Sequence, residues 1–305
     1  MIHGVVTVRK EKGMTSFGVV ARMRRIFGQK KIGHTGTLDP DAEGVLPVCL
    51  GRATKLVETL MQGTKTYEAV ILMGRTTDTQ DTSGTVLKES PYTGTEEEFR
   101  RVLLSFSGRQ MQTPPMFSAL KVNGQKLVDL ARRGIEVERR PREVEFRDME
   151  LLWFDSPRAA FRVTCSHGAY IRTLCHDIGE KLGCGACMDA LTRTRVGEFC
   201  IGDAMTLDEI AARKAEEDAE SAAQYSFVRT IDSFYEALPA VRIREEALQA
   251  ALSGNPLKLS DLAEEEKKPA EDAEMRVYTS DGLFIGIYRR QRGRIRLEKF
   301  YYESH

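Results

Sequence analysis

The sequence has 305 residues, of which 41% are hydrophobic and 30% charged, as expected for a globular protein of two domains or one domain with an appendage. No apolar run is long enough to span a membrane, and the N-terminus lacks the features of a secretory signal peptide, so we expect a cytoplasmic protein. Lys plus Arg and Asp plus Glu each number 45, and a net charge of zero excludes neither nucleic acid nor protein as partner, since distribution matters more than the sum.

The first predicted elements are a strand over Val5–Val8 and a helix from about Phe17 to Phe27. Thr15 or Ser16 can cap this helix and Gly28 can end it. Apolar residues at helical spacing predict that one face packs on a core. Residues 1–33 also contain eight Lys or Arg against one acid, Glu11.

The stretch Gly33-His34-Thr35-Gly36-Thr37-Leu38-Asp39-Pro40 follows. Its two glycines permit backbone conformations that other residues avoid, and Asp39 is biased to an extended conformation by the proline after it. A carboxylate on such a stiff turn suits a nucleophile or a general base. The alternative is an ordinary turn in which Asp39 bonds only its own backbone and His34 is a packed or solvated histidine.

Further along the chain, strands and helices alternate, which predicts a mixed α/β domain. We expect helices over Gly51–Met61, Glu96–Phe106 and Tyr170–Leu182, strands over Tyr67–Met73 and around Phe161–Cys165, and a turn-rich segment over 78–84. Residues 116–147 carry eight Lys or Arg against five acids. A long basic insertion of this kind suggests a clamp over a ligand.

The composition changes again from Leu238. Residues 212–224 are acidic and alanine-rich, and 261–274 form an acidic stretch expected to be a loop. A hairpin is predicted from Met275–Tyr278 and Leu283–Tyr288, with a further strand over Arg294–Phe300. We therefore expect a catalytic domain over 1–235 and a small β-rich domain over 238–305, whose last twenty residues carry six Lys or Arg.

Six cysteines raise the question of metal binding. Cys184 and Cys187 have the spacing of zinc ligands, and Cys175-His176 lies nearby. Two adjacent residues make a poor second pair of ligands, so structural thiols are the favoured interpretation and a zinc protein is the alternative. No phosphate-binding loop or dinucleotide fingerprint is present, so we expect neither a metal nor a cofactor.

Several motifs, taken in order, resemble those of the TruB family of tRNA pseudouridine synthases over about residues 3–202. They are GHTGTLDP at 33–40, Lys65-Thr66-Tyr67, GRTTDTQD at 74–81, TPPMFSA at 113–119, GAYIRT at 168–173 and LTRTRVG at 191–197. The resemblance implies the pseudouridine-synthase fold with a mixed central sheet, an insertion that grips an RNA stem-loop, and a C-terminal RNA-binding domain of PUA-like type. It also implies isomerisation of uridine at position 55 in the T loop of tRNA, by a monomer without obligate protein partners, cofactor or metal.

The resemblance also assigns roles to six residues. Asp39 would be the catalytic aspartate and Arg172 its ion-pair partner. Tyr67 would stack on the target base, and Tyr170 and Leu191 would line the same pocket. His34 would stack into the RNA loop and help to displace the uridine. Val128 stands where the family often has a tyrosine. The competing hypothesis is a non-catalytic RNA-binding module, for which the basic regions alone would suffice.

Overall fold

The computed structural model describes residues 1–220, 224–263 and 268–302. The N-terminal segment builds β1 (Gly4–Lys10), α1 (Ser16–Phe27), β2 (Ile32–His34), β3 (Glu43–Leu50), the 3₁₀ helix η1 (Gly51–Leu56) and α2 (Val57–Met61). The Thr15 hydroxyl caps α1 by accepting a hydrogen bond from the Gly18 amide, and Gly28 ends the helix in the left-handed conformation. Both ends of this helix confirm the prediction from the sequence.

The middle of the chain adds more strands and helices. They are β4 (Lys65–Met73), β5 (Arg75–Thr77), β6 (Val86–Glu89), α3 (Glu96–Leu104), β7 (Gly108–Gln112), β8 (Lys121–Val122), β9 (Gln125–Lys126), α4 (Leu127–Ala131), β10 (Arg142–Asp155), β11 (Arg158–Cys165), α5 (Ile171–Leu182), β12 (Ala186–Val196), β13 (Phe199–Cys200), the 3₁₀ helix η2 (Ile201–Asp203) and α6 (Leu207–Ala219). The predicted strand at 67–73 and the helices at 96–106 and 170–182 are therefore present with small shifts at their ends.

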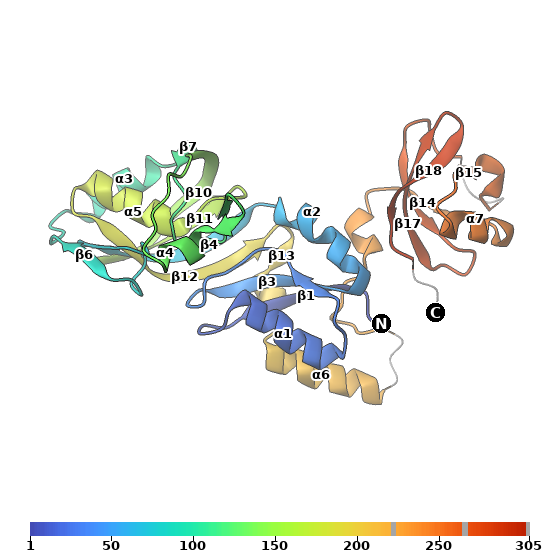
Figure 1. Cartoon of the computed structure of the whole chain (residues 1–305), viewed down its shortest axis with the longest axis horizontal. Helices are drawn as coiled ribbons and strands as arrows, with labels where there is room; N and C mark the ends of the chain where they lie inside the picture. The colour runs from blue at the N-terminus through green and yellow to red at the C-terminus, as the bar shows by residue number, and fades with distance from the viewer. Residues whose placement is uncertain (221–223, 264–267, 303–305) are drawn as a thin grey trace.

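A mixed sheet of nine strands, counted over the described residues, forms the centre of the molecule. Its order is β1-β3-β12-β4-β11-β10-β7, with β2 beside β3 and β13 beside β12. Most neighbours are antiparallel, but β12 and β3 run parallel. Since β12 also pairs along its length with β4, this strand joins the two halves of the sheet (Figure 1).

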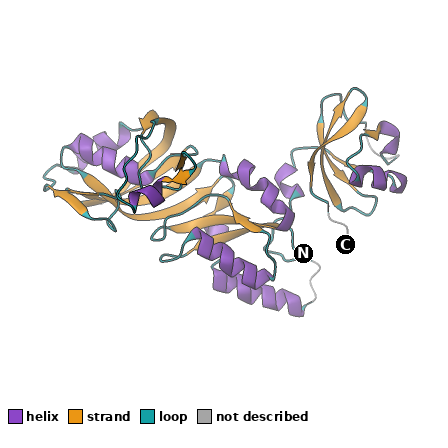
Figure 2. Cartoon of the chain, in the orientation of Figure 1, coloured by secondary structure: helices purple, strands orange, loops and turns teal. Residues whose placement is uncertain are grey.

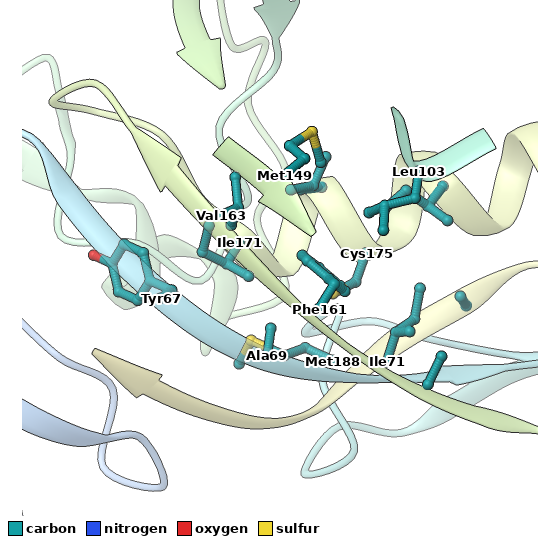
Figure 3. Close-up of a cluster of buried hydrophobic side chains, with 14 of the residues drawn as sticks. Tyr67, Ala69, Ile71, Leu103, Met149, Phe161, Val163, Ile171, Cys175 and Met188 are labelled. Atoms are coloured by element: carbon teal, nitrogen blue, oxygen red, sulfur yellow. The ribbon is translucent and has the colours of Figure 1, made fainter. Parts of the chain in front are cut away.

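Two pairs of helices cover different parts of this sheet (Figure 2). Helices α1 and α6 lie side by side on β1 and β3, and their apolar residues share one buried cluster. Helices α3 and α5 pack on β4, β10, β11 and β12 and bury a second cluster (Figure 3). Phe99 and Leu103 of α3 and Leu174 and Ile178 of α5 are fully buried there. No helix in the described ranges is both long and apolar enough to cross a bilayer.

A separate five-stranded sheet follows in the last part of the chain, in the order β14-β16-β17-β18-β15. The elements of this last part of the chain are the 3₁₀ helix η3 (Asp232–Tyr235), β14 (Ala240–Arg242), η4 (Glu245–Ala247), α7 (Leu248–Leu252), β15 (Leu257–Lys258), η5 (Leu259–Asp261), β16 (Glu274–Tyr278), β17 (Phe284–Gln291) and β18 (Arg294–Phe300). The predicted hairpin and final strand are confirmed by β16, β17 and β18. Part of the acidic stretch 261–274 lies outside the described residues.

Two expectations need correction. Residues 51–61 are helical, but Gly51–Leu56 form a 3₁₀ helix, in which the Thr54 hydroxyl donates to the Gly51 carbonyl at 2.8 Å, and only Val57–Met61 are α-helical. The basic insertion was expected to extend to residue 147. Strand β10 already begins at Arg142 and pairs with β7, so only the residues before it lie outside the sheet.

Candidate active site

Asp39 lies in the loop between β2 and β3, and this loop is anchored on both sides of it. The Ser16 hydroxyl accepts a hydrogen bond from the Leu38 amide at 2.9 Å and lies 3.1 Å from the Leu38 carbonyl. The ammonium of Lys10, which is fully buried, donates to the carbonyls of Pro40 and Ala42. These bonds restrict the conformations of the loop, so the carboxylate is held before any ligand arrives.

Arg172, in the first turn of α5, binds Asp39 directly. Its Nε lies 3.1 Å from Oδ2 of Asp39, and one of its terminal nitrogens lies 3.4 Å from Oδ1. The guanidinium also donates to the carbonyls of Thr79, at 3.0 Å, and Phe117, at 2.6 Å. The side chain is 7% exposed, so Asp39, Thr79 and Phe117, from three segments of the chain, fix the orientation of the guanidinium.

The electrostatics of Asp39 combine two opposing effects. Burial raises the pKa of its carboxyl group, while the charge of Arg172, and more weakly that of Lys10, lowers it. Asp81 lies 3.6 Å from Arg172 and also raises the pKa of Asp39. Asp39 is thus a carboxylate of raised basicity that is paired with one fixed cation.

Two cavities meet at this ion pair. One has a volume of about 340 Å³, and the other, on the side of the Thr79–Ser83 turn, about 370 Å³. Asp39, Arg172 and Leu191 line both. The larger one also contains Val128 from α4, the residue that stands in place of the family's tyrosine, so the insertion reaches the rim of the site.

Tyr67, Tyr170 and Leu191 gather around the smaller cavity with the Asp39–Arg172 pair. Tyr67 stands at the edge of the buried cluster, with its hydroxyl directed away from the other labelled side chains (Figure 3). Leu191 is brought there by the pairing of β12 with β4, in which it lies opposite Ala69. The side-chain amide of Gln112 holds the backbone of Tyr170, because its Nε2 donates to the Tyr170 carbonyl and its Oε1 accepts from the Tyr170 amide.

His34 is the one predicted site residue that lines neither cavity. It ends β2, and its Nδ1 accepts a hydrogen bond from the Gly36 amide at 3.3 Å. Burial lowers the pKa of its imidazole, which favours the neutral form. Its role in displacing a nucleotide stays a prediction.

Among the charged residues at the site that had no role assigned from the sequence are Lys10, Asp81 and Arg193. Arg193 is 1% exposed and donates to the carbonyls of Val45, at 2.8 Å, and Gly36. It also lowers the pKa of the Tyr67 hydroxyl, which burial raises more strongly. Asp81 and Arg193 lie within the motifs at 74–81 and 191–197, so the motifs contained the signal. Lys10 is one of many cations near the N-terminus, and only the fold distinguishes it.

The cysteines do not assemble a metal site in the described part of the chain. No group of three or more His, Cys, Asp or Glu side chains there could hold a metal ion. Cys184 and Cys187 are buried, and burial raises the pKa of Cys187 to about 11. Zinc requires the thiolate, so the zinc alternative has no ligand set among these residues.

Comparison with known proteins identifies the family. Residues 24–171 match the N-terminal domain of the TruB family pseudouridylate synthases, and residues 172–237 match the tRNA pseudouridylate synthase B C-terminal domain. The chain is 41% identical to a tRNA pseudouridine synthase B from Clostridium acetobutylicum over 94% of its own length and 95% of the relative's. The chain belongs to the TruB family. A relative of the same name from Azoarcus sp. is 40% identical over 97% of this chain and 94% of its own.

Solved structures agree with this assignment. A chain in the structure of an H/ACA RNP bound to a substrate RNA containing 2′-deoxyuridine matches with a TM-score of 0.68 and 25% identity, over 98% of this chain and 85% of that one. A chain of an archaeal box H/ACA sRNP Nop10–Cbf5 complex matches with a TM-score of 0.67 and 26% identity, over 98% of this chain and 86% of that one. The TruB-family chain described here therefore has the pseudouridine-synthase fold and is an isomerase that converts uridine to pseudouridine.

Proposed function

We propose that this enzyme isomerises the uridine at position 55 in the T loop of tRNA and that Asp39 is its catalytic residue. Relatives about 40% identical over most of their length carry the name tRNA pseudouridine synthase B. The observation that carries the assignment of Asp39 is its ion pair with Arg172 at the junction of two cavities. A chain that only bound RNA would not need a carboxylate there.

The reaction matches the groups at this site. The N-glycosidic bond of uridine breaks, the sugar rejoins the base at C5, the C5 proton leaves and N1 gains a proton. Nothing is oxidised and no group is added, so the isomerisation needs no redox partner. A carboxylate can attack the sugar, attack the uracil ring, or remove a proton from the sugar. The raised basicity of Asp39 favours each of these roles.

The target base must leave the stacked loop to reach Asp39. Flipping costs a few kcal/mol, and stacking on an aromatic side chain returns about 1–3 kcal/mol per base. Tyr67 provides that platform, Tyr170 and Leu191 complete the walls, and His34 fills the space left in the RNA loop. We also assign the removal of the C5 proton to Tyr67, whose hydroxyl must first lose its own proton; Arg193 lowers the pKa of this hydroxyl, although burial raises it more strongly.

Phosphate contacts come from the basic N-terminal region, the insertion before β10 and the C-terminal strands. We assign residues 1–235 to a catalytic domain and 238–305 to a PUA-like RNA-binding domain. The enzyme acts as a monomer in the cytoplasm, without an obligate protein partner.

The test is tritium release from tRNA transcripts labelled at C5 of uridine. The wild-type protein should release tritium, Asp39→Ala should not, and Asp39→Ala should still bind tRNA. A transcript without the T-loop uridine should give no release. Tight binding of tRNA without release by the wild type would instead favour the RNA-binding module.

A further inference from the structure

One end of the central sheet gathers cations next to the smaller cavity. Strand β4 begins with Lys65, β10 begins with Arg142, and β11 ends at Cys165, two residues before His167. Lys65 pairs with Cys165 across β4 and β11, and Phe146 of β10 pairs with the same cysteine. Because these strands are antiparallel, Lys65, Arg142 and His167 meet at the same edge, and all three line the cavity that contains Asp39.

The charges around this cavity do not balance. Lys65, Arg142, Arg172 and Arg193 line it, whereas Asp39 is the only carboxylate among the described residues that do. Arg172 pairs with Asp39, and Arg193 donates to backbone carbonyls. Lys65 also donates only to carbonyls, those of Met61 at 2.6 Å and Gly63 at 2.7 Å. The cavity therefore has a positive surplus that no side chain of its lining neutralises.

Lys65 and Arg142 differ in their exposure and in the hydrogen-bond donors that they can offer to an anion. Lys65 is 7% exposed, and burial and the charge of Arg193 lower its pKa to about 8. Its ammonium has three protons, of which two are used by the carbonyls. Arg142 is exposed and has no ion-pair partner in the part of the chain that the structure describes. The positive charges of both Lys65 and Arg142 act on the intervening His167.

We propose that Lys65 and Arg142, with His167 beside them, form a subsite for one backbone phosphate adjacent to the nucleotide that enters the cavity. This rests on the proposed function, which supplies RNA as the ligand. A flipped nucleotide brings a phosphate on either side of its sugar, and the base end of the cavity is occupied by Asp39, Tyr67 and Leu191. The cationic edge then neutralises the phosphate and fixes the sugar relative to Asp39.

The test couples one side chain to one phosphate. Arg142→Gln removes the exposed charge at a strand end, and Arg100→Gln on α3, an exposed arginine paired with Glu96, is the matched control. T stem-loop RNAs carry a single uncharged methylphosphonate at the linkage 5′ or 3′ of the target uridine, or at a stem linkage. Each is compared with the same RNA bearing a phosphate there. Affinities are measured in an Asp39→Asn background, which prevents turnover.

We expect Arg142→Gln to weaken binding of the unmodified RNA roughly tenfold to a hundredfold, and Arg100→Gln to leave it within about twofold. In the protein that retains Arg142, a methylphosphonate at one of the two linkages beside the uridine should weaken binding by a similar factor. The same methylphosphonate should not weaken the binding of the Arg142→Gln protein any further. The linkage that behaves in this way identifies the phosphate. The His167→Gln protein should show a partial loss at the same linkage.

The subsite would be overturned if the losses of affinity from Arg142→Gln and from the methylphosphonate multiplied at every linkage. It would also be overturned if Arg142→Gln and Arg100→Gln bound the unmodified RNA equally well. The failure of the proposed function is separate. Proteins that retain Asp39 would then release no tritium from any RNA, while the coupling between Arg142 and one phosphate could still be read from the affinities.

Discussion

At the scale of single residues, the site is defined by what holds Asp39 rather than by Asp39 itself. Arg172 neutralises it, and Ser16 and Lys10 fix the backbone on its two sides. Each of these partners is far from Asp39 in the sequence or belongs to a different element. We therefore expect the loss of one of these partners to lower kcat/KM, and thermal unfolding shows whether the fold is kept.

The activity should depend on the ionisation of Asp39. Because burial raises the pKa of its carboxyl group above the ordinary 3.8, kcat/KM should fall on acidification with a midpoint above that value. Arg172 lowers this pKa, so Arg172→Met should reduce activity and also move the midpoint to higher pH. Tritium release measured between about pH 4 and 8 tests both points. An unchanged midpoint in Arg172→Met would show that another group governs the acid limb.

Lys10 should act as a positioning residue. Replacing it by Met removes the donor to the Pro40 and Ala42 carbonyls, so the loop that carries Asp39 gains freedom. We expect kcat/KM to fall by about ten- to a hundredfold, since small displacements of a reacting group cost this much. Lys181→Met, at an exposed lysine on α5 that bonds Ser105, is the control. Thermal unfolding of both variants shows whether the fold is kept, and activity within twofold of wild type would exclude this role.

At the scale of elements, local signals in the sequence located α1, α3, α5 and six of the eighteen strands in the described residues, but not the long strands β3, β10 and β12. Thr15 and Gly28 mark both ends of α1 because caps act within one turn. The parallel pairing of β3 with β12, in contrast, joins residues about 150 apart and leaves no local pattern. This pairing brings Arg193 and Leu191 to the loop of Asp39, so their surroundings could not be derived from spacing. The resemblance to the family indicated which residues share the site and that Arg172 pairs with Asp39, but not the contacts of Lys10 or Arg193.

The pairing of β3 with β12 requires a glycine at position 44. It has a φ of +109°, and a Cβ there would lie 2.2 Å from the carbonyl oxygen of Arg193 in β12. Gly44→Ala should separate the two strands and destabilise the fold by about 3 kcal/mol or more. Gly28→Ala, at a φ of +62° with open space around it, should cost about 1 kcal/mol from backbone strain alone. Chemical denaturation measures both, and equal losses would mean that the close approach of β3 and β12 is not a constraint.

At the scale of the whole molecule, the zero net charge conceals an uneven distribution. Three acids of α6, Glu216, Glu217 and Asp218, are neutralised within that helix by Arg213 and Lys214. Part of the C-terminal basic run is neutralised too, because Arg289 pairs with Glu274 and Glu298. Arg294 and Arg296 are exposed and have no carboxylate partner among the described residues. The number of cations available for phosphates is therefore smaller than the sequence suggests.

This distinction predicts how salt acts on RNA binding. Each phosphate neutralised by a cation releases counterions, so the affinity for tRNA should fall steeply, by roughly tenfold or more between about 50 and 200 mM salt. Arg296→Gln should make this dependence shallower, because its charge is free to meet a phosphate. Arg289→Gln, in the same sheet, should leave the slope unchanged, because two glutamates already neutralise that arginine. Filter binding over a salt series compares the slopes. Equal slopes for Arg296→Gln and wild type would mean that this strand does not contact the backbone of tRNA, and the C-terminal sheet would then bind RNA through another face.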